Sequence, residues 1–149
     1  MQESTPEGTT FVIVAVRGSG SETASERIDR LVRREGIWGI RAGSFSRNKM
    51  RRGAGICFYA SETGIVADAR IASDPTSDFH PSLGSEGFRW TFRVENVRVY
   101  AERPVRLDEA MRSQLEAFRF RDSVAWGWFV QRPNAISAHD FEKLTARSR

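Results

Sequence analysis

Apolar residues in the first half of the chain follow the patterns of β-strands. The run Phe11–Val16 (FVIVAV) is apolar at every position, which predicts an interior strand covered on both faces. A second apolar strand is predicted over Ile56–Ala60. In Ile65–Ile71, apolar residues alternate with Asp68 and Arg70, which predicts a strand with one face toward the core.

Helical spacing appears between the first two strands. A helix is predicted from about Glu22 to Glu35, with Ala24, Ile28, Leu31 and Val32 on its inner face. Thr23 and Glu26 have the spacing of a capping box, and Gly36 is expected to end the helix in the left-handed conformation.

The outer face of this predicted helix is basic. We place four arginines there, Arg27, Arg30, Arg33 and Arg34. Two interpretations stay open: a solvated face mixed with acids, or a face that contacts phosphate.

The segment Phe88–Tyr100 has the clearest alternation in the chain. Phe88, Trp90, Phe92 and Val94 share one face, and then the apolar positions shift by one residue to Val97 and Val99. A change of phase within a continuous strand predicts a bulge near Glu95 and Asn96. Bulges allow a sheet to bend toward a barrel.

The last third of the chain adds helices and one more strand. A helix capped by Asp108 is predicted to direct Met111, Leu115 and Phe118 inward. Ser123–Val130 is predicted to be a strand, and Arg132–Asn134 a turn. Ser137 and Asp140 form the capping box of a final helix that packs through Phe141 and Leu144.

These elements predict an α+β fold. Strands follow one another after Gly53 without crossover helices, which argues against a doubly wound parallel sheet. An antiparallel barrel, or a strongly bent sheet with helices at its rim, explains the order. We expect residues 1–10 to be a flexible tail and residues 11–149 to be a single domain.

Composition narrows the functional classes. Of 23 basic residues only Lys49 and Lys143 are lysine, and the net charge of +4 permits a polyanion partner. The single Cys57 excludes an intrachain disulfide and is expected to be an inert core thiol. We expect no membrane segment and a cytoplasmic location.

Candidate catalytic groups are few. The two histidines, His80 and His139, lie in polar sequence, and the pattern predicts neither a nucleophilic triad nor a metal or other cofactor site. Asp68 and Asp74 would be catalytic only if they were buried together. The residues therefore favour a binding module over an enzyme.

The segment Gly36–Ser61 holds the best candidate binding site. Trp38 supplies a flat face for stacking, and Gly39 allows close approach of a ligand to the backbone. The loop Arg41–Arg52 supplies cations and polar groups for phosphates, namely Arg41, Ser46, Arg47, Asn48, Lys49 and Arg51. The alternative is that Trp38 simply fills the core.

The order and spacing of these segments resemble the EVE domains of the PUA-like superfamily, which includes the YTH and ASCH domains. The matching segments are FVIVAV, GIWGI, RRGAG before ICFYAS, GIVADARIASDP, FRWTFRVENVRV, PVRL and SVAWGWFV, covering roughly Phe11 to Thr145. The basic loop departs from the family, which often has Lys-Pro-Gly-Asp where this chain has Arg51-Arg52-Gly53-Ala54.

The resemblance implies a PUA-like bent sheet or barrel of five or six strands with flanking helices. It also implies a pocket for a flipped nucleobase, often a modified one, in RNA or DNA. The residues carried over as base-binding are Trp38 and Gly39, Arg17 and Ser19 after the first strand, Phe79 or His80 as an opposite wall, and Tyr59.

Two alternatives follow from the same resemblance. ASCH-like domains include amidohydrolases that act on acetylated cytidine and use a lysine, for which Lys49 is the candidate. A small-molecule or protein-interaction site in the same concavity is the other. The sequence leaves the kind of nucleic acid, the modification and the oligomeric state open.

Overall fold

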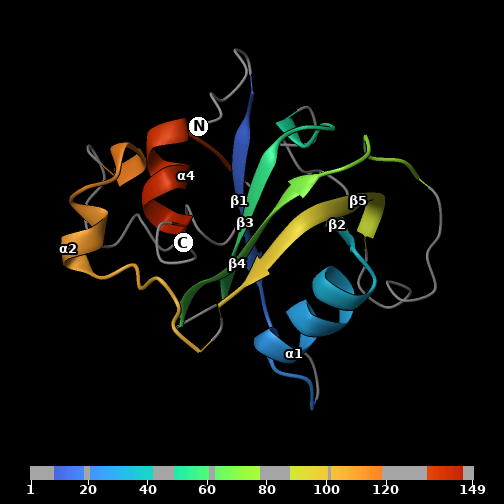
Figure 1. Cartoon of the computed structure of the whole chain (residues 1–149), viewed down its shortest axis with the longest axis horizontal. Coiled ribbons are helices and arrows are strands. Elements are labelled where there is room, and N and C mark those ends of the chain that lie inside the picture. Colours follow the sequence, from blue (N-terminus) through green and yellow to red (C-terminus); the bar gives the residue numbers. More distant parts are fainter. Residues whose placement is uncertain are drawn as a thin grey trace.

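The computed structural model describes residues 9–18, 21–41, 49–60, 63–77, 88–100, 102–118 and 134–145. Its strands form a single curled sheet in the order β2-β5-β4-β3-β1-β6 (Figure 1). The strands are β1 (Phe11–Val16), β2 (Ile37–Arg41), β3 (Gly55–Ala60), β4 (Gly64–Ile71), β5 (Phe88–Val99) and β6 (Asn134–Ile136). The predicted α+β bent sheet is confirmed.

Most neighbouring strands are antiparallel, and one pair is parallel. β1 runs parallel to β3 and antiparallel to β6, so the strand predicted to be interior is interior. The connection from β1 to β2 contains helix α1 (Ala24–Ile28), which continues as a π-helical segment η1 (Asp29–Arg34). Asn134, expected in a turn, begins β6 instead, because its segment pairs with β1.

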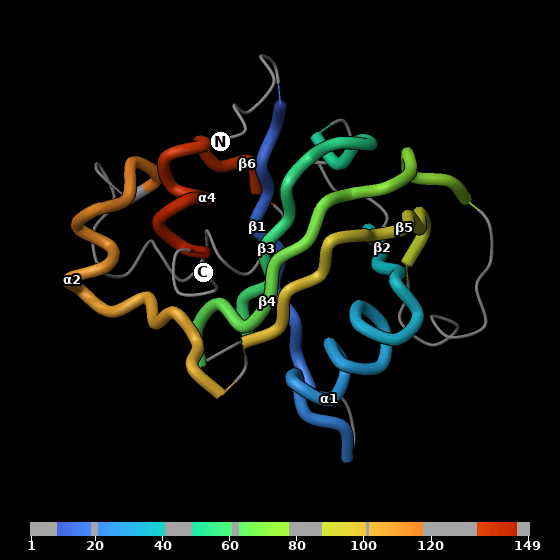
Figure 2. Tube along the Cα trace, in the orientation of Figure 1, coloured from blue at the N-terminus to red at the C-terminus, as the bar shows by residue number. Residues whose placement is uncertain are grey.

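The sheet separates two hydrophobic clusters. The first cluster lies on the face toward α1 and η1 and includes Val12, Val14, Ile28, Leu31, Trp38, Phe58 and Phe92. The second cluster lies on the opposite face and includes Ile13, Cys57, Tyr59, Leu115 and Leu144. Successive residues of β1 and β3 thus point to opposite clusters, as the pleat of a strand requires. Figure 2 shows α1 on one side of the sheet and α4 on the other.

The predicted signals at the ends of the first helix are confirmed. The Thr23 hydroxyl accepts a hydrogen bond from the Glu26 backbone N–H, and the Glu26 carboxylate accepts one from the Thr23 N–H. Gly36 has a φ of +67°, a conformation that glycine adopts without strain. These local contacts direct the chain straight into β2.

The predicted bulge in β5 is also confirmed. Asp68 of β4 faces Arg98 and Arg70 faces Glu95, so two residues of β5 stand opposite Ala69. One of them, Asn96, has a φ of +51°. The bulge lets β5 pair with β2 through its first half and with β4 through its second half.

The second half of the chain covers the second cluster. Helix α2 (Glu109–Arg112) is capped by Asp108 as predicted, but it is short and gives way to the 3₁₀ turn η4 (Glu116–Phe118). The last helix, α4 (Ala138–Thr145), packs on β1, β3 and β4.

The Ser137 cap of α4 is confirmed, because its hydroxyl accepts from the Asp140 N–H. The other half of the predicted capping box is wrong, since the Asp140 carboxylate accepts from the N–H groups of Glu116 and Ala117 instead.

Some expectations lie outside the described residues. They include most of the N-terminal tail, the strand Ser123–Val130 and the side chain of Phe118. Within the part of the chain that the structure describes, no helix is long and apolar enough to cross a membrane.

Candidate nucleic-acid interface

Trp38 lies in the middle of β2, directly opposite Phe92 of β5. Its side chain points to the first cluster and is only 3% exposed. The helix stop at Gly36 and the pairing with β5 fix this orientation, because the Gly36 carbonyl accepts from the Val94 N–H at 2.8 Å. The indole is therefore covered by neighbouring side chains in this structure.

Two phenylalanines surround the indole. The ring centroids of Phe58 and Phe88 lie 5.4 Å and 5.3 Å from that of Trp38, with interplanar angles of 84° and 60°. Neither ring is parallel to the indole, so both contacts are of the edge-to-face kind. Phe88 is half-buried, whereas Phe58 is fully buried.

Gly39 brings Phe88 close to the β2 backbone. A Cβ atom added to Gly39 would lie 2.5 Å from the Phe88 ring, far inside van der Waals contact. The sequence predicted that a ligand approaches the backbone at Gly39; in the structure the group that lies there is the Phe88 ring. Any larger residue at this position would displace that ring.

Arg27 lies beside the same indole, contrary to the expectation that it faces solvent. Its side chain is 4% exposed, and its guanidinium carbon lies 5.5 Å from the Trp38 ring centroid. Its Nη1 donates a 2.8 Å hydrogen bond to the Arg17 carbonyl. Position 27 falls between Ala24 and Leu31 on the apolar stripe of the helix, a signal that the sequence contained.

The other three helix arginines have acidic partners. Arg30 pairs with Glu22 at 2.7 Å, and Asp29 pairs with Arg33 at 2.6 Å and with Arg34 at 3.2 Å. The hydrogen bond from Arg30 lowers the pKa of the Glu22 carboxyl. This arrangement is that of a solvated face mixed with acids.

The structure does not gather both of the remaining predicted base-binding residues that it describes, Arg17 and Tyr59, around Trp38. Arg17 is exposed directly after β1. Tyr59 is buried in the second cluster, so the structure does not bring it to Trp38. Successive side chains of β3 point to opposite faces of the sheet, so Tyr59 points away from Phe58 and Trp38. Ser19, Phe79 and His80 lie outside the described residues.

Lys49 and Arg51 are exposed on the turn before β3. Backbone hydrogen bonds hold this turn against the sheet: Thr10 Oγ1 donates to the Lys49 carbonyl, and the Gly53 N–H donates to the Ile71 carbonyl. Arg41 ends β2, while Ser46, Arg47 and Asn48 lie outside the described residues.

Two further exposed arginines, Arg89 and Arg93, lie on β5 and were not among the predicted phosphate ligands. The Arg93 carbonyl accepts from the Ala72 N–H, and the Arg52 N–H donates to Asp74. These bonds place Arg93 and the turn before β3 on either side of the segment 72–74. In the first half of β5 these arginines alternate with the apolar residues, and this alternation was the sequence signal for a solvent-facing side of the strand.

Asp68 and Asp74 are not buried together. Asp68 is buried and accepts hydrogen bonds from Arg98 Nε and the Tyr100 hydroxyl, each at 3.0 Å, whereas Asp74 is exposed. Burial raises the pKa of the Cys57 thiol and of the Tyr100 phenol. Cys57 is a buried, free core thiol, as predicted.

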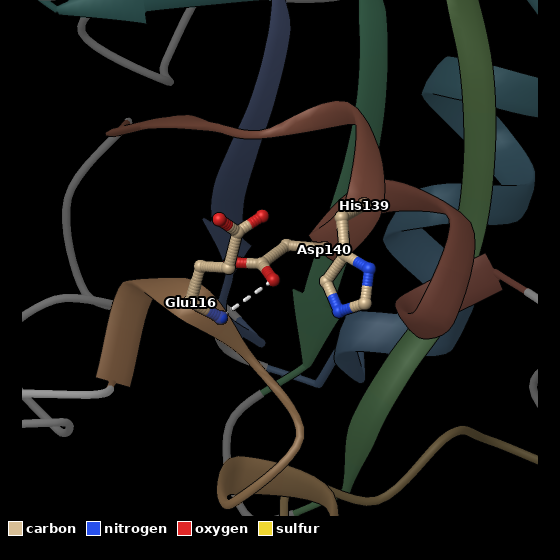
Figure 3. Close-up of side chains that lie close together, drawn as sticks. All are labelled: Glu116, His139 and Asp140. Carbon is tan, nitrogen blue, oxygen red and sulfur yellow. Dashed lines mark hydrogen bonds between the residues drawn. The ribbon is translucent and has the colours of Figure 1, made fainter.

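Glu116, His139 and Asp140 form one cluster that resembles a metal site (Figure 3). Their ligand atoms lie within 4.8 Å of one another. Each side chain already has a hydrogen bond: both Asp140 oxygens accept backbone N–H groups, His139 Nε2 contacts the Gln114 carbonyl, and Glu116 accepts from Ser137. These bonds join α4 to η4, which accounts for the cluster structurally.

Solved structures with the same fold include nucleic-acid complexes. The YTH domain of the Zygosaccharomyces rouxii MRB1 protein, in complex with N6-methyladenosine RNA, has a TM-score of 0.59 and 16% identity, covering 99% of this chain and 92% of its own. The Pho92 YTH domain in complex with m6A has a TM-score of 0.61 and 13% identity, with 98% and 87% covered. Human THYN1 in complex with 5-methylcytosine containing DNA has a TM-score of 0.56 and 16% identity, with 95% and 98% covered.

The PUA-like fold of YTH and EVE domains is therefore the fold of this chain. No protein-family model matches the sequence, and no curated protein sequence matches it.

Proposed function

We propose that this chain, which has the fold of YTH domains and THYN1, is a nucleic-acid-binding module that captures a flipped, modified nucleobase at Trp38. The observation that carries the proposal is the aromatic cluster of Trp38 and Phe88 at Gly39, beside the buried Arg27. Solved complexes with m6A RNA and with 5-methylcytosine DNA on the same fold support a modified base as the ligand.

Base capture requires Phe88 to move. Trp38 is covered, and the Phe88 ring occupies the space next to Gly39. A base that stacks on the indole lies parallel to it and takes the place of the Phe88 ring, which contacts the indole through its edge. One aromatic contact of the indole is thus exchanged for another. Stacking is worth about 1–3 kcal/mol per base, against a flipping cost of a few kcal/mol.

Cations on the surface supply the rest of the binding energy. Lys49 and Arg51 are exposed on a turn held to the sheet by hydrogen bonds, and a fixed turn loses little entropy when it binds phosphate. Such contacts are independent of sequence and weaken as salt rises. The indole would then decide which base is held, and the cations how tightly.

Replacing the indole tests the proposal. Because Trp38 is buried, Trp38→Ala is expected to destabilise the fold by about 3–5 kcal/mol, so Trp38→Leu is the better variant. We expect Trp38→Leu to bind modified and unmodified oligonucleotides equally, measured by fluorescence anisotropy on m6A RNA and 5-methylcytosine DNA.

Phe58→Leu is the matched control, because Phe58 contacts the same indole from the fully buried side. It should keep the preference for the modified base. The proposal fails if folded Trp38→Leu keeps the wild-type preference.

A further inference from the structure

A buried cation in the first cluster calls for an explanation. Arg27 is 4% exposed and lies against the Trp38 ring of the first cluster. After the hydrogen bond from Arg30, its charge also contributes to lowering the pKa of the Glu22 carboxyl. Moving a guanidinium from water into a core is costly, and a hydrophobic residue of similar volume often stabilises such a site as well or better. Its position is therefore better explained by what the guanidinium contacts than by core packing.

The guanidinium joins two candidate base-binding residues of the sequence, Arg17 and Trp38. Nη1 donates to the carbonyl of Arg17, the first residue after β1, and the guanidinium carbon lies 5.5 Å from the Trp38 ring centroid. The first contact holds the backbone of Arg17 at the end of β1, and the second fixes the indole by a cation–π interaction. One planar group thus sets the position of both residues relative to the helix.

We infer that Arg27 is the positioning residue of the Trp38 site: it holds the indole and the backbone of Arg17 in the geometry that accepts a base, and it does so at the expense of core stability. The inference rests on the proposed function. A planar, donor-only side chain suits this role, because it can bind a carbonyl in its plane while its charge lies against a ring. Lysine offers the charge without the plane.

The test uses Arg27→Met, which keeps an unbranched side chain and removes the charge. We expect its melting temperature to be equal to or above that of the wild type, while its preference for a modified over an unmodified oligonucleotide falls several-fold. Arg30→Met is the matched control, since Arg30 lies further along the same helical segment and pairs at the surface with Glu22. It should leave the preference unchanged.

The indole N–H resonance of Trp38, assigned with Trp38→Phe, gives a second readout that needs no nucleic acid. We expect it to shift in Arg27→Met and to stay in place in Arg30→Met. If folded Arg27→Met keeps both the wild-type preference and the wild-type resonance, the inference is wrong.

If Arg27→Met does not fold, Arg27→Lys tests the inference instead. A folded lysine variant with reduced preference supports the role of the planar group, and one with the wild-type preference overturns it. A wild-type protein without preference for any modified oligonucleotide would overturn the proposed function, while the resonance would still report whether Arg27 positions the ring.

Discussion

At the scale of single residues, the candidate site depends on what surrounds one indole. Trp38 contacts the fully buried Phe58, the half-buried Phe88 and the guanidinium of Arg27 on α1. Phe88 begins β5, is half-buried and fills the space that Gly39 leaves, whereas Phe58 is fully buried. Phe88 is therefore the contact of the indole that lies nearer the surface of the molecule.

Replacing Phe88 with alanine should ease entry of the base. A ligand that binds only after a side chain moves has its affinity reduced by the population of the open form, so removing that side chain raises apparent affinity. We expect Phe88→Ala to bind a modified oligonucleotide at least as tightly as the wild type, with faster association in stopped-flow measurements. If instead the variant loses its preference as Trp38→Leu does, Phe88 is a wall of the site and not its cover.

At the scale of elements, a carboxylate joins two segments that sequence patterns treat as separate. Asp140 is 1% exposed and accepts N–H bonds at 2.7 Å from Glu116 and 2.8 Å from Ala117. It thereby caps the turn η4 from the neighbouring helix α4 (Figure 3). The second cluster beneath them includes Leu115 and Leu144, so this cap helps to close that face of the sheet.

Removal of this cap should reduce stability without changing base preference. Asp140→Ala leaves two backbone N–H groups without their acceptor, which we expect to cost about 1–3 kcal/mol. Lys143→Ala, on the exposed side of the same helix, is the control and should have little effect. Urea unfolding followed by circular dichroism gives both free energies. Equal values for the two variants would contradict the capping role.

At the scale of the whole molecule, the two faces of the sheet have different surroundings. One face packs against α1 and η1 and holds the Trp38 site, while α4 covers part of the other (Figure 1). Exposed arginines gather where the turn before β3, the end of β4 and the first half of β5 meet, and they include Arg51, Arg52, Arg70, Arg89 and Arg93. Asp74 and Glu95 are the acids among them.

These arginines should determine the salt dependence of binding. For an Arg51→Ala and Arg93→Ala double variant, we expect weaker binding to modified and unmodified oligonucleotides alike. The slope of log K against log salt should fall by about 0.7–0.9 for each phosphate that the variant no longer neutralises. Arg106→Ala is the control, since Arg106 is exposed next to Leu107 of the second cluster. An unchanged slope in the double variant would place the phosphates elsewhere.

Signals that act within a few residues were sufficient to predict much of this fold. The capping box of Thr23 and Glu26, the left-handed Gly36 and the bulge at Asn96 were all predicted, because each arises from neighbouring backbone and side-chain atoms. The continuous apolar run of β1 likewise predicted its interior place. The choice of Trp38 as the candidate pocket residue came from the sequence as well and stays a prediction.

Tertiary structure decided which partner each of these side chains meets. From the sequence we placed Arg27 on the outer face of its helix and Asp140 in the capping box of its own helix, and the family resemblance assigned Tyr59 to base binding. Folding brings Arg27 to the indole, Tyr59 to the opposite face and Asp140 to η4. Periodicity gives the face of an element on which a residue lies, but contacts between distant segments depend on how the sheet curls and where the helices pack against it.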